Sequence, residues 1–356
     1  MNPSAQPNIR FAVIGINHGH IHGQVAHLVN AGAQFVAFYA PEPDLAEPFA
    51  LRYPQVKRAS GEAELLEDSS LHLIVTSGIP SARAALGVRT MCHGKDFMTD
   101  KPGFTTLAQL EEVRRVQLVT GRIYSVCYSE HFEVASVIRA GELVASGSIG
   151  KVVQTVGLGP HKTNLASRPW WYFEREHYGG ILTDIGSHQA EQFLFFTGSS
   201  SAEVVCSQVA NYKHPQHPGF EDWGEMSLRG DGGHGYIRLD WYTPDGLGVW
   251  GDGRLMILGT EGYIELRKYV DPSGNPGGEH LILVNQQGMQ RLNCSGGDLP
   301  YGRQLIQDIL QRSETAMPQS RCFLAAQLAL EAQAKALRLG HMKDALENTI
   351  LSQGQA

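Results

Sequence analysis

The sequence is poor in cysteine, in positive charge and in long apolar runs, and each shortage argues against a class of protein. Five cysteines among 356 residues, with no paired spacing, speak against a disulfide framework or a thiolate metal site. With 29 basic against 36 acidic side chains the net charge is -7, which leaves no basic surface for nucleic acid. The segment from Met1 to Asn8 is polar, and no apolar run approaches a membrane-spanning length. We therefore expect a cytoplasmic protein without nucleic-acid or membrane partners.

A glycine-containing turn follows the first apolar run. Residues 10–14 are predicted as a strand and residues 21–31 as an amphipathic helix, with Gly15-Ile16-Asn17-His18-Gly19-His20 between them. In this setting a glycine-rich loop holds a pyrophosphate at a helix N-terminus. The usual fingerprint has three glycines; here the second is Asn17, which tolerates positive φ, and the third is His20, which replaces a close-packing glycine. Two interpretations stay open, a dinucleotide-binding turn and an ordinary strand-to-helix turn.

Residues 1–127 alternate apolar strands with helical stretches. The predicted strands cover residues 11–14, 35–39, 73–77, 97–99 and 123–127. The predicted helices cover residues 24–31, 45–52, 81–93 and 107–120. Such alternation predicts an α/β domain with a doubly wound parallel sheet, whose ligands lie at the carboxyl ends of the strands. Gly15, Ser77 and Asp100 stand at such ends.

Residues 128–356 show a different pattern, and a chain of this length exceeds what one core usually supports. The predicted helices cover residues 134–145, 183–196, 302–311 and 323–339. The predicted strands cover residues 151–158, 202–209, 225–228, 235–241, 248–250, 254–258, 263–268 and 280–284. Their spacing predicts an α+β domain with a large, mostly antiparallel open sheet. Apolar runs at 236–241 and 255–257 need a cover, which predicts a homodimer or homotetramer that pairs sheet on sheet.

Asp184 and His188 stand four residues apart, on one face of the helix predicted at 183–196, and Glu191 continues their row. The preceding pair Gly179-Gly180 lets a backbone approach a ligand closely. Two interpretations remain. The pair serves catalysis, or Asp184 caps the helix while His188 bonds a loop.

Four segments, taken in order, resemble the glucose–fructose oxidoreductase/inositol dehydrogenase (Gfo/Idh/MocA) family over nearly the whole chain. They are Asp100-Lys101-Pro102, similar to the Glu-Lys-Pro signature of the family, Tyr128-Ser129-Glu130-His131-Phe132, the run from Gly179 to His188, and Gly259-Thr260-Glu261-Gly262. The resemblance implies an NAD(P)-binding Rossmann domain in residues 1–127. It implies a domain for substrate binding and oligomerisation in residues 128–356.

The resemblance also implies that Lys101, Asp184 and His188 are catalytic. Oxidation of an alcohol needs a base for the hydroxyl proton and a cation to stabilise the developing alkoxide. His188 has a suitable pKa for the base, Lys101 supplies the charge, and Asp184 orients the imidazole or binds a neighbouring hydroxyl. The predicted substrate-binding residues are Lys101, Glu130, His131, His161, Trp171, Asp184 and His188.

The predicted cofactor-binding residues are Gly15, Asn17, His18, Gly19, His20, Glu42, Ser77, Gly78, Pro80, Asp100 and Lys101. Ala40 stands where an acidic residue would bind the adenosine ribose, and Glu42 follows in the next turn. Since no arginine or lysine follows Tyr39 closely enough to neutralise a 2′-phosphate, we predict NAD and leave NADP open. His18 and His20 lie in the predicted phosphate loop, so we assign no metal. Arg83, where family members often carry histidine, receives no role.

The predicted function is that of an NAD(P)-dependent dehydrogenase, which moves hydride between nicotinamide and a secondary alcohol of a sugar, inositol or related polyol. The same residues would serve an NAD-dependent lyase or glycosidase that oxidises a sugar transiently. A non-catalytic nucleotide-binding regulator is the third reading, and it has no need for Lys101, Asp184 and His188 together.

Overall fold

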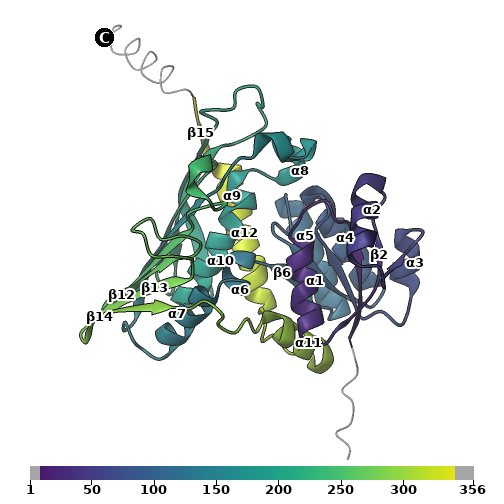
Figure 1. The fold of residues 1–356 in the computed structure, drawn as a ribbon, viewed down its shortest axis with the longest axis horizontal. Helices are drawn as coiled ribbons and strands as arrows, with labels where there is room; N and C mark the ends of the chain where they lie inside the picture. Colours follow the sequence, from purple (N-terminus) through teal and green to yellow (C-terminus); the bar gives the residue numbers. More distant parts are fainter. Residues whose placement is uncertain (1–8, 341–356) are drawn as a thin grey trace, which may run out of the picture.

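Two β-sheets with their helices build the protein, as a computed structural model that describes residues 9–340 shows (Figure 1). The first sheet is parallel, with strand order β3-β2-β1-β4-β5-β6. Its strands are β1 (Arg10–Ile14), β2 (Gln34–Tyr39), β3 (Lys57–Arg58), β4 (Leu73–Thr76), β5 (Asp96–Asp100) and β6 (Tyr124–Cys127). Its helices are α1 (Ile21–Asn30), α2 (Pro43–Arg52), α3 (Glu62–Glu67), α4 (Pro80–Cys92) and α5 (Leu107–Thr120). Every residue of β4 and β5 is buried, as expected for a parallel sheet with helices on both faces.

This order confirms the predicted doubly wound sheet, and it places the switch point between β1 and β4. The turns after these two strands are tied together. Ser77 N donates to Gly15 O at 3.1 Å, and His18 N donates to Ser77 O at 3.0 Å. The sequence did not predict β3 and α3, because two and six residues are too few to show a period.

The second sheet is mostly antiparallel and nine-stranded, in the order β14-β13-β12-β11-β7-β10-β9-β8-β15. Its strands are β7 (Val152–Pro160), β8 (Ala202–Ala210), β9 (Trp223–Gly230), β10 (His234–Asp240), β11 (Arg254–Gly259), β12 (Gly262–Arg267), β13 (His280–Asn285), β14 (Gly288–Asn293) and β15 (Leu337–Leu339). Parallel pairs occur at β7–β10 and β8–β15. Leu255 and Ile257 of β11 are buried while Met256 and Leu258 are exposed, so one face of the sheet carries a core.

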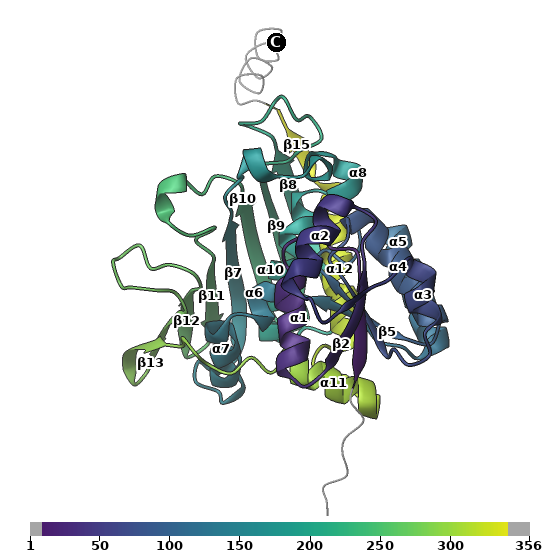
Figure 2. The ribbon, with the colours of Figure 1, turned by 45° about the vertical axis from the view of Figure 1, so that its right-hand side comes forward.

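That core is closed by α7 (Ala135–Ala145), α9 (Ile181–Asp184), α10 (Gly186–Thr197) and α12 (Gln319–Lys335), which lie on one face of the sheet (Figures 1 and 2). The remaining elements are short: α6 (Ser129–Phe132), α8 (Arg175–Tyr178) and the 3-10 helices η1 (Leu165–Ser167), η2 (Trp170–Phe173) and η3 (Asp245–Leu247). Among residues 9–340, no helix has the length and apolar character needed to cross a membrane.

Three predicted elements were wrong in the second half. The helix predicted at 183–196 is two helices, α9 and α10, that meet at Ile185. Residues 248–250 are not a strand; they follow η3, and Trp250 lines a cavity there. The last helix ends at Lys335, and residues 337–339 form β15, because pairing with β8 outweighs a weak helical period.

The chain returns to the first sheet at its end. Helix α11 (Tyr301–Gln311) packs against α1, and α12 lies between the two sheets (Figures 1 and 2). Gln319 Oε1 accepts a hydrogen bond from Tyr124 N of edge strand β6 at 2.9 Å, and Arg312 donates to Asp96 at 2.7 and 2.8 Å. These contacts fix the relative position of the two halves, and the boundary at residue 127 stays a prediction.

Candidate active site

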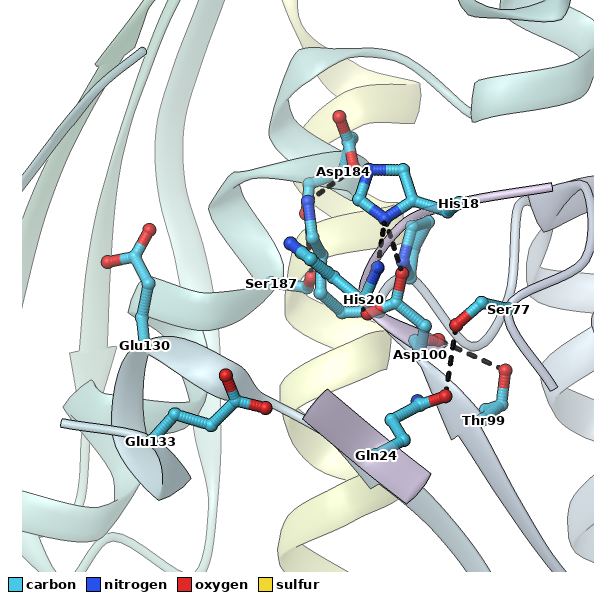
Figure 3. Close-up of polar contacts among 12 residues, drawn as sticks. His18, His20, Gln24, Ser77, Thr99, Asp100, Glu130, Glu133, Asp184 and Ser187 are labelled. Atoms are coloured by element: carbon cyan, nitrogen blue, oxygen red, sulfur yellow. Dashed lines mark hydrogen bonds and ion pairs between the residues drawn. The ribbon is translucent and has the colours of Figure 1, made fainter. Parts of the chain in front are cut away.

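Two histidines of the glycine turn face one carboxylate at the end of β5 (Figure 3). His20 Nδ1 lies 2.9 Å from Asp100 Oδ1, and His18 Nδ1 lies 3.5 Å from Asp100 Oδ2. Burial alone raises the pKa of the Asp100 carboxyl, but His20 and Arg83 outweigh burial and hold that pKa well below its usual range. His18, His20 and Asp100 place ligand-type atoms within 4.8 Å of one another. The carboxylate also faces Arg83 at 3.4 Å, and the absence of a metal here remains a prediction.

The turn fits a dinucleotide in two respects, a free acceptor on Glu42 and open space at Gly19. Asn17 does not adopt the positive φ that the sequence suggested. Its side-chain amide donates to Glu42 Oε1 at 3.0 Å. Glu42 Oε2 is buried and has no partner among the described residues, which suits a ribose hydroxyl donor. A Cβ built on Gly19 would meet no atom within 4 Å, so the space before the turn is open. The residues present therefore fit NAD at this turn.

Gly15 is required by the backbone itself. Its φ is +81°, and a Cβ at this position would lie 3.0 Å from the Cα of Gly78. Behind the turn, Ser77 is fully buried with its hydroxyl oxygen 2.9 Å from the Gln24 amide, and Pro80 begins α4. Ser77 and Gly78 thus contact the turn, and the cofactor contacts predicted for Ser77, Gly78 and Pro80 stay predictions.

Arg83, which had no predicted role, anchors the Asp-Lys-Pro segment. Its buried guanidinium donates to the carbonyl oxygens of Asp100 at 3.0 Å, Lys101 at 2.7 Å and Pro102 at 3.0 Å. Its Nε donates to Gly78 O at 2.7 Å. One side chain therefore joins the turn after β4 to the segment that carries Lys101. Nothing in the sequence pattern around Arg83 indicated these contacts.

Lys101 is held by a carboxylate from the second half of the chain. Lys101 Nζ donates to Asp184 Oδ1 at 2.8 Å, and Tyr172 OH donates to Asp184 Oδ2 at 3.0 Å. Lys101 and Asp184 are only 5% and 4% exposed. Asp184 makes no hydrogen bond to His188 among the described residues, and both roles predicted for it, orienting the imidazole and binding a neighbouring hydroxyl, stay predictions. Tyr172 completes this group, although the sequence had predicted its neighbour Trp171 as the site residue.

His188 projects from the first turn of α10 into the same cavity. Burial is the main cause that lowers its pKa well below the usual value, and Lys101 adds to the shift. The sequence could not reveal this burial, and the role of His188 as the base stays a prediction. His188 Nδ1 has no partner among residues 9–340. The side chain is a neutral imidazole that can accept a proton.

A cavity of about 430 Å³ joins the two halves at these residues. It is lined by His18, His20, Lys101, Ser129, Glu130, Glu133, Val134, His161, Arg168, Tyr172, His188, Trp241, Trp250 and Tyr269. Three predicted substrate contacts, His131, Trp171 and Asp184, lie outside this lining. His131 Nδ1 is 2.8 Å from the buried Glu191 Oε2, so Glu191 does not continue the Asp184 row into the cavity, and Trp171 is buried beside Tyr172.

A dinucleotide turn beside a lysine, an aspartate and a neutral histidine defines the class of nicotinamide-dependent oxidoreductases. Comparison with known proteins agrees with this class. Residues 9–128 match an oxidoreductase family with an NAD-binding Rossmann fold, and residues 137–265 match the GFO/IDH/MocA C-terminal domain. The chain belongs to the Gfo/Idh/MocA family.

Three relatives illustrate the range of similarity. A protein of known crystal structure from Erwinia carotovora atroseptica is 47% identical, with 94% of this chain and 100% of that chain covered and a TM-score of 0.91. Levoglucosan dehydrogenase in complex with NADH is 16% identical over 92% of this chain and 97% of its own, with a TM-score of 0.75, and so shares the fold. D-xylose dehydrogenase of Paenarthrobacter nicotinovorans is 26% identical over 129 residues, 35% of this chain and 33% of that protein. The chain thus matches one third of the length of this curated relative.

Proposed function

We propose that this protein is an NAD-dependent dehydrogenase that interconverts a secondary alcohol of a sugar or related polyol and the corresponding ketone. The observation that carries the proposal is the Lys101 ammonium, held 2.8 Å from Asp184 at the wall of a cavity that also contains His188. The glycine turn that fits a dinucleotide opens onto the same cavity through His18 and His20. Names of relatives such as D-xylose dehydrogenase support a sugar as the substrate class.

The residues divide the chemistry among them. His188, as a neutral base, takes the hydroxyl proton of the alcohol. Lys101 stabilises the negative charge that develops on the oxygen, while Asp184 and Tyr172 keep the ammonium in place. Gly19, Asn17 and Glu42 would hold NAD, which when bound supplies the hydride acceptor. Burial of the group excludes water and so strengthens each electrostatic contact.

A panel of sugars and polyols with NAD and with NADP tests the proposal. Both the reduced-nicotinamide absorbance and the product mass are followed. Net reduction supports the dehydrogenase. Product without net reduction contradicts it and selects a lyase or glycosidase that oxidises the sugar transiently, and nucleotide binding with neither result selects a regulator.

Gly19→Val tests the cofactor turn. Since a Cβ at Gly19 meets no protein atom within 4 Å, the variant should fold normally, yet its side chain fills the space that a pyrophosphate needs. We expect NAD affinity to fall at least about tenfold, a loss of roughly 1.4 kcal/mol, with an unchanged melting temperature. Calorimetry measures the affinity. Gly15→Val is a poorer probe because its positive φ makes any side chain there strained.

We also propose that the open face of the second sheet pairs with a second copy. Within residues 9–340, helices α7, α9, α10 and α12 pack on its other face, and neighbouring outward positions include Val156, Tyr236 and Met256. Met256 and Leu258 are 38% and 37% exposed in the single chain. Light scattering should show a dimer or tetramer, and Met256→Asp should shift it toward the monomer. A monomer at micromolar concentration would contradict the proposal.

A further inference from the structure

Apart from Lys101 and its partner Asp184, the cavity carries a second buried ion pair at Glu130, which lies away from Asp184 (Figure 3). Glu130 Oε2 accepts hydrogen bonds from Lys268 Nζ at 2.8 Å and from Gln189 Nε2 at 2.7 Å. Lys268 also donates to Gln192 Oε1 at 3.0 Å, and it is fully buried behind the cavity wall. Glu130 is 2% exposed and lines the cavity. Its other oxygen, Oε1, is buried and has no partner among the described residues.

The atom that faces this oxygen is also an acceptor. His161 Nδ1 lies 3.1 Å from Gly159 O, and because a carbonyl only accepts, Nδ1 carries the proton. Burial lowers the pKa of His161 to about 4, so the ring is neutral and Nε2 has a free lone pair. His161 Nε2 lies 4.0 Å from Glu130 Oε1. Two acceptors therefore stand side by side, and residues 9–340 supply no hydrogen-bond donor to Glu130 Oε1.

We infer that Glu130 Oε1 and His161 Nε2 bind two adjacent hydroxyl groups of the substrate, so the enzyme selects a neutral sugar or polyol with a vicinal diol at this end. The inference rests on the proposed function, whose site it extends. A single hydroxyl has one proton and satisfies one acceptor, whereas two adjacent hydroxyls satisfy both. An unmade hydrogen bond to a buried carboxylate is costly, which gives the pair its selectivity.

The charges decide between ligand classes. Lys268 already balances the charge of Glu130, so the subsite offers no net negative charge to a cation such as an amino sugar. A carboxylate placed against Glu130 Oε1 and His161 Nε2 would meet two acceptors and receive no proton from either of them. Burial raises the pKa of the Glu130 carboxyl, but the Lys268 ammonium outweighs burial and holds that pKa well below its usual range, so the carboxylate remains an acceptor.

The walls suit a sugar ring. The ring of Trp250 lies 4.5 Å from that of His161 and 4.4 Å from that of Tyr269, and the ring of Trp241 lies 5.3 Å from that of His161. Such aromatic faces cover the apolar C–H face of a sugar. Trp241 Nε1 is a buried donor without a partner among the described residues, so it adds a contact for a hydroxyl oxygen.

Calorimetry of the NADH-loaded enzyme with D-glucose, D-xylose, myo-inositol and their singly deoxygenated analogues tests the inference. Removal of either of two adjacent hydroxyls should weaken binding at least about tenfold, and removal of the others should weaken it less. In Glu130→Gln the dissociation constant of the parent sugar should rise, and the ratio between deoxy and parent sugar should fall toward one. A general loss of structure would not produce that change of ratio.

Two further variants guard against misfolding. Glu130→Gln combined with Lys268→Met removes the ion pair without leaving a buried unpaired ammonium, and it should show the same loss of discrimination. Glu191→Gln is the matched control, since Glu191 is equally buried and is paired with His131 at 2.8 Å outside the cavity lining. It should leave the ratio unchanged.

The outcomes separate this inference from the proposed function. Sugar binding that depends on Glu130, without any NADH formation by the wild-type enzyme, supports the subsite and contradicts the dehydrogenase. Oxidation of sugars with an unchanged ratio in Glu130→Gln supports the dehydrogenase and overturns the subsite. Failure of every neutral polyol to bind, or sensitivity at two non-adjacent hydroxyls, also overturns the subsite.

Discussion

Each end of the cavity has a buried ion pair between a lysine and a carboxylate. The lysine lines the cavity at one end, and the carboxylate lines it at the other. At one end Lys101 lines the cavity, and Asp184 holds its ammonium at 2.8 Å. At the other end Glu130 lines the cavity, and the fully buried Lys268 holds its carboxylate at 2.8 Å. The member of each pair that lines the cavity decides what the site offers to a ligand. Lys101 offers a cation to a developing alkoxide, and Glu130 offers an acceptor to a hydroxyl. A buried pair therefore informs about function through its orientation, and less through its contribution to stability.

The largest expected effect comes from the two lysines. Lys101→Met should cut the single-turnover rate roughly a hundredfold or more and leave NAD affinity within a modest factor, because it removes the charge that stabilises the transition state. Lys268→Met should mainly raise the KM for the sugar, because it disturbs a binding group. Rapid-quench kinetics, normalised to folded protein, measure both. If both variants lower kcat equally, the assignment of Lys101 to the chemical step and of Lys268 to sugar binding is contradicted.

His188 shows whether the Lys101 end acts as one unit. His188→Ala should also slow turnover about a hundredfold, and the double variant with Lys101→Met should lose much less than the product of the single losses. If His188 only packs or bonds a loop, the melting temperature of His188→Ala falls and turnover per folded molecule stays nearly unchanged.

The next effect concerns the pH dependence of stability, because each end of the cavity contains a buried neutral histidine. Burial lowers the pKa of His161 to about 4 and that of His188 well below 6.5. As the pH falls, these histidines are protonated in the unfolded chain before they are protonated in the folded protein. The free energy of unfolding is therefore unaffected by them above pH 6.5 and decreases as the pH falls toward 4. Melting curves should show this decline, and His161→Gln should flatten it. A melting temperature that is constant from pH 7 to about 4 would contradict these assignments.

The acid limb of kcat/KM sharpens the same point. Because His188 must be neutral to accept a proton, and its pKa is lowered, the limb should lie below pH 6.5. His161→Gln should leave the position of the limb unchanged, since His161 belongs to the binding end. If the acid limb shifts in His161→Gln, the titrating base is His161 and the assignment of His188 as the base is contradicted.

The smallest effect concerns the hydroxyl that supports Asp184. Tyr172→Phe removes the 3.0 Å hydrogen bond to Asp184 Oδ2 but leaves the contact between Lys101 and Asp184. Turnover should fall about tenfold, the order expected for one hydrogen bond to a charged group. Steady-state kinetics measure this change. A loss as large as that of Lys101→Met would show that the tyrosine contributes more than support.

Much of the fold could be predicted because its signals are local. The strands and helices of the first half show clear periods, and the predicted 107–120 helix matches α5. Predicted elements were wrong where long-range pairing decided, as at β15, or where glycines interrupted a short apolar run, as around Trp250. The site followed the same rule. Motifs indicated Lys101, Asp184 and His188. The structure places Lys101 and His188 in one cavity lining and pairs Asp184 with Lys101, although 83 residues separate Lys101 from Asp184.

The sequence by itself determined the doubly wound sheet, the glycine turn and the identity of the groups fit for alcohol chemistry, because these depend on residue type and short spacing. Only the tertiary structure decided how those groups are used. It paired Asp184 with Lys101, gave Tyr172 the place predicted for Trp171, and brought Lys268 to Glu130 across 138 residues. Burial, orientation and the pKa of a side chain depend on what packs around it, and those neighbours come from distant parts of the chain.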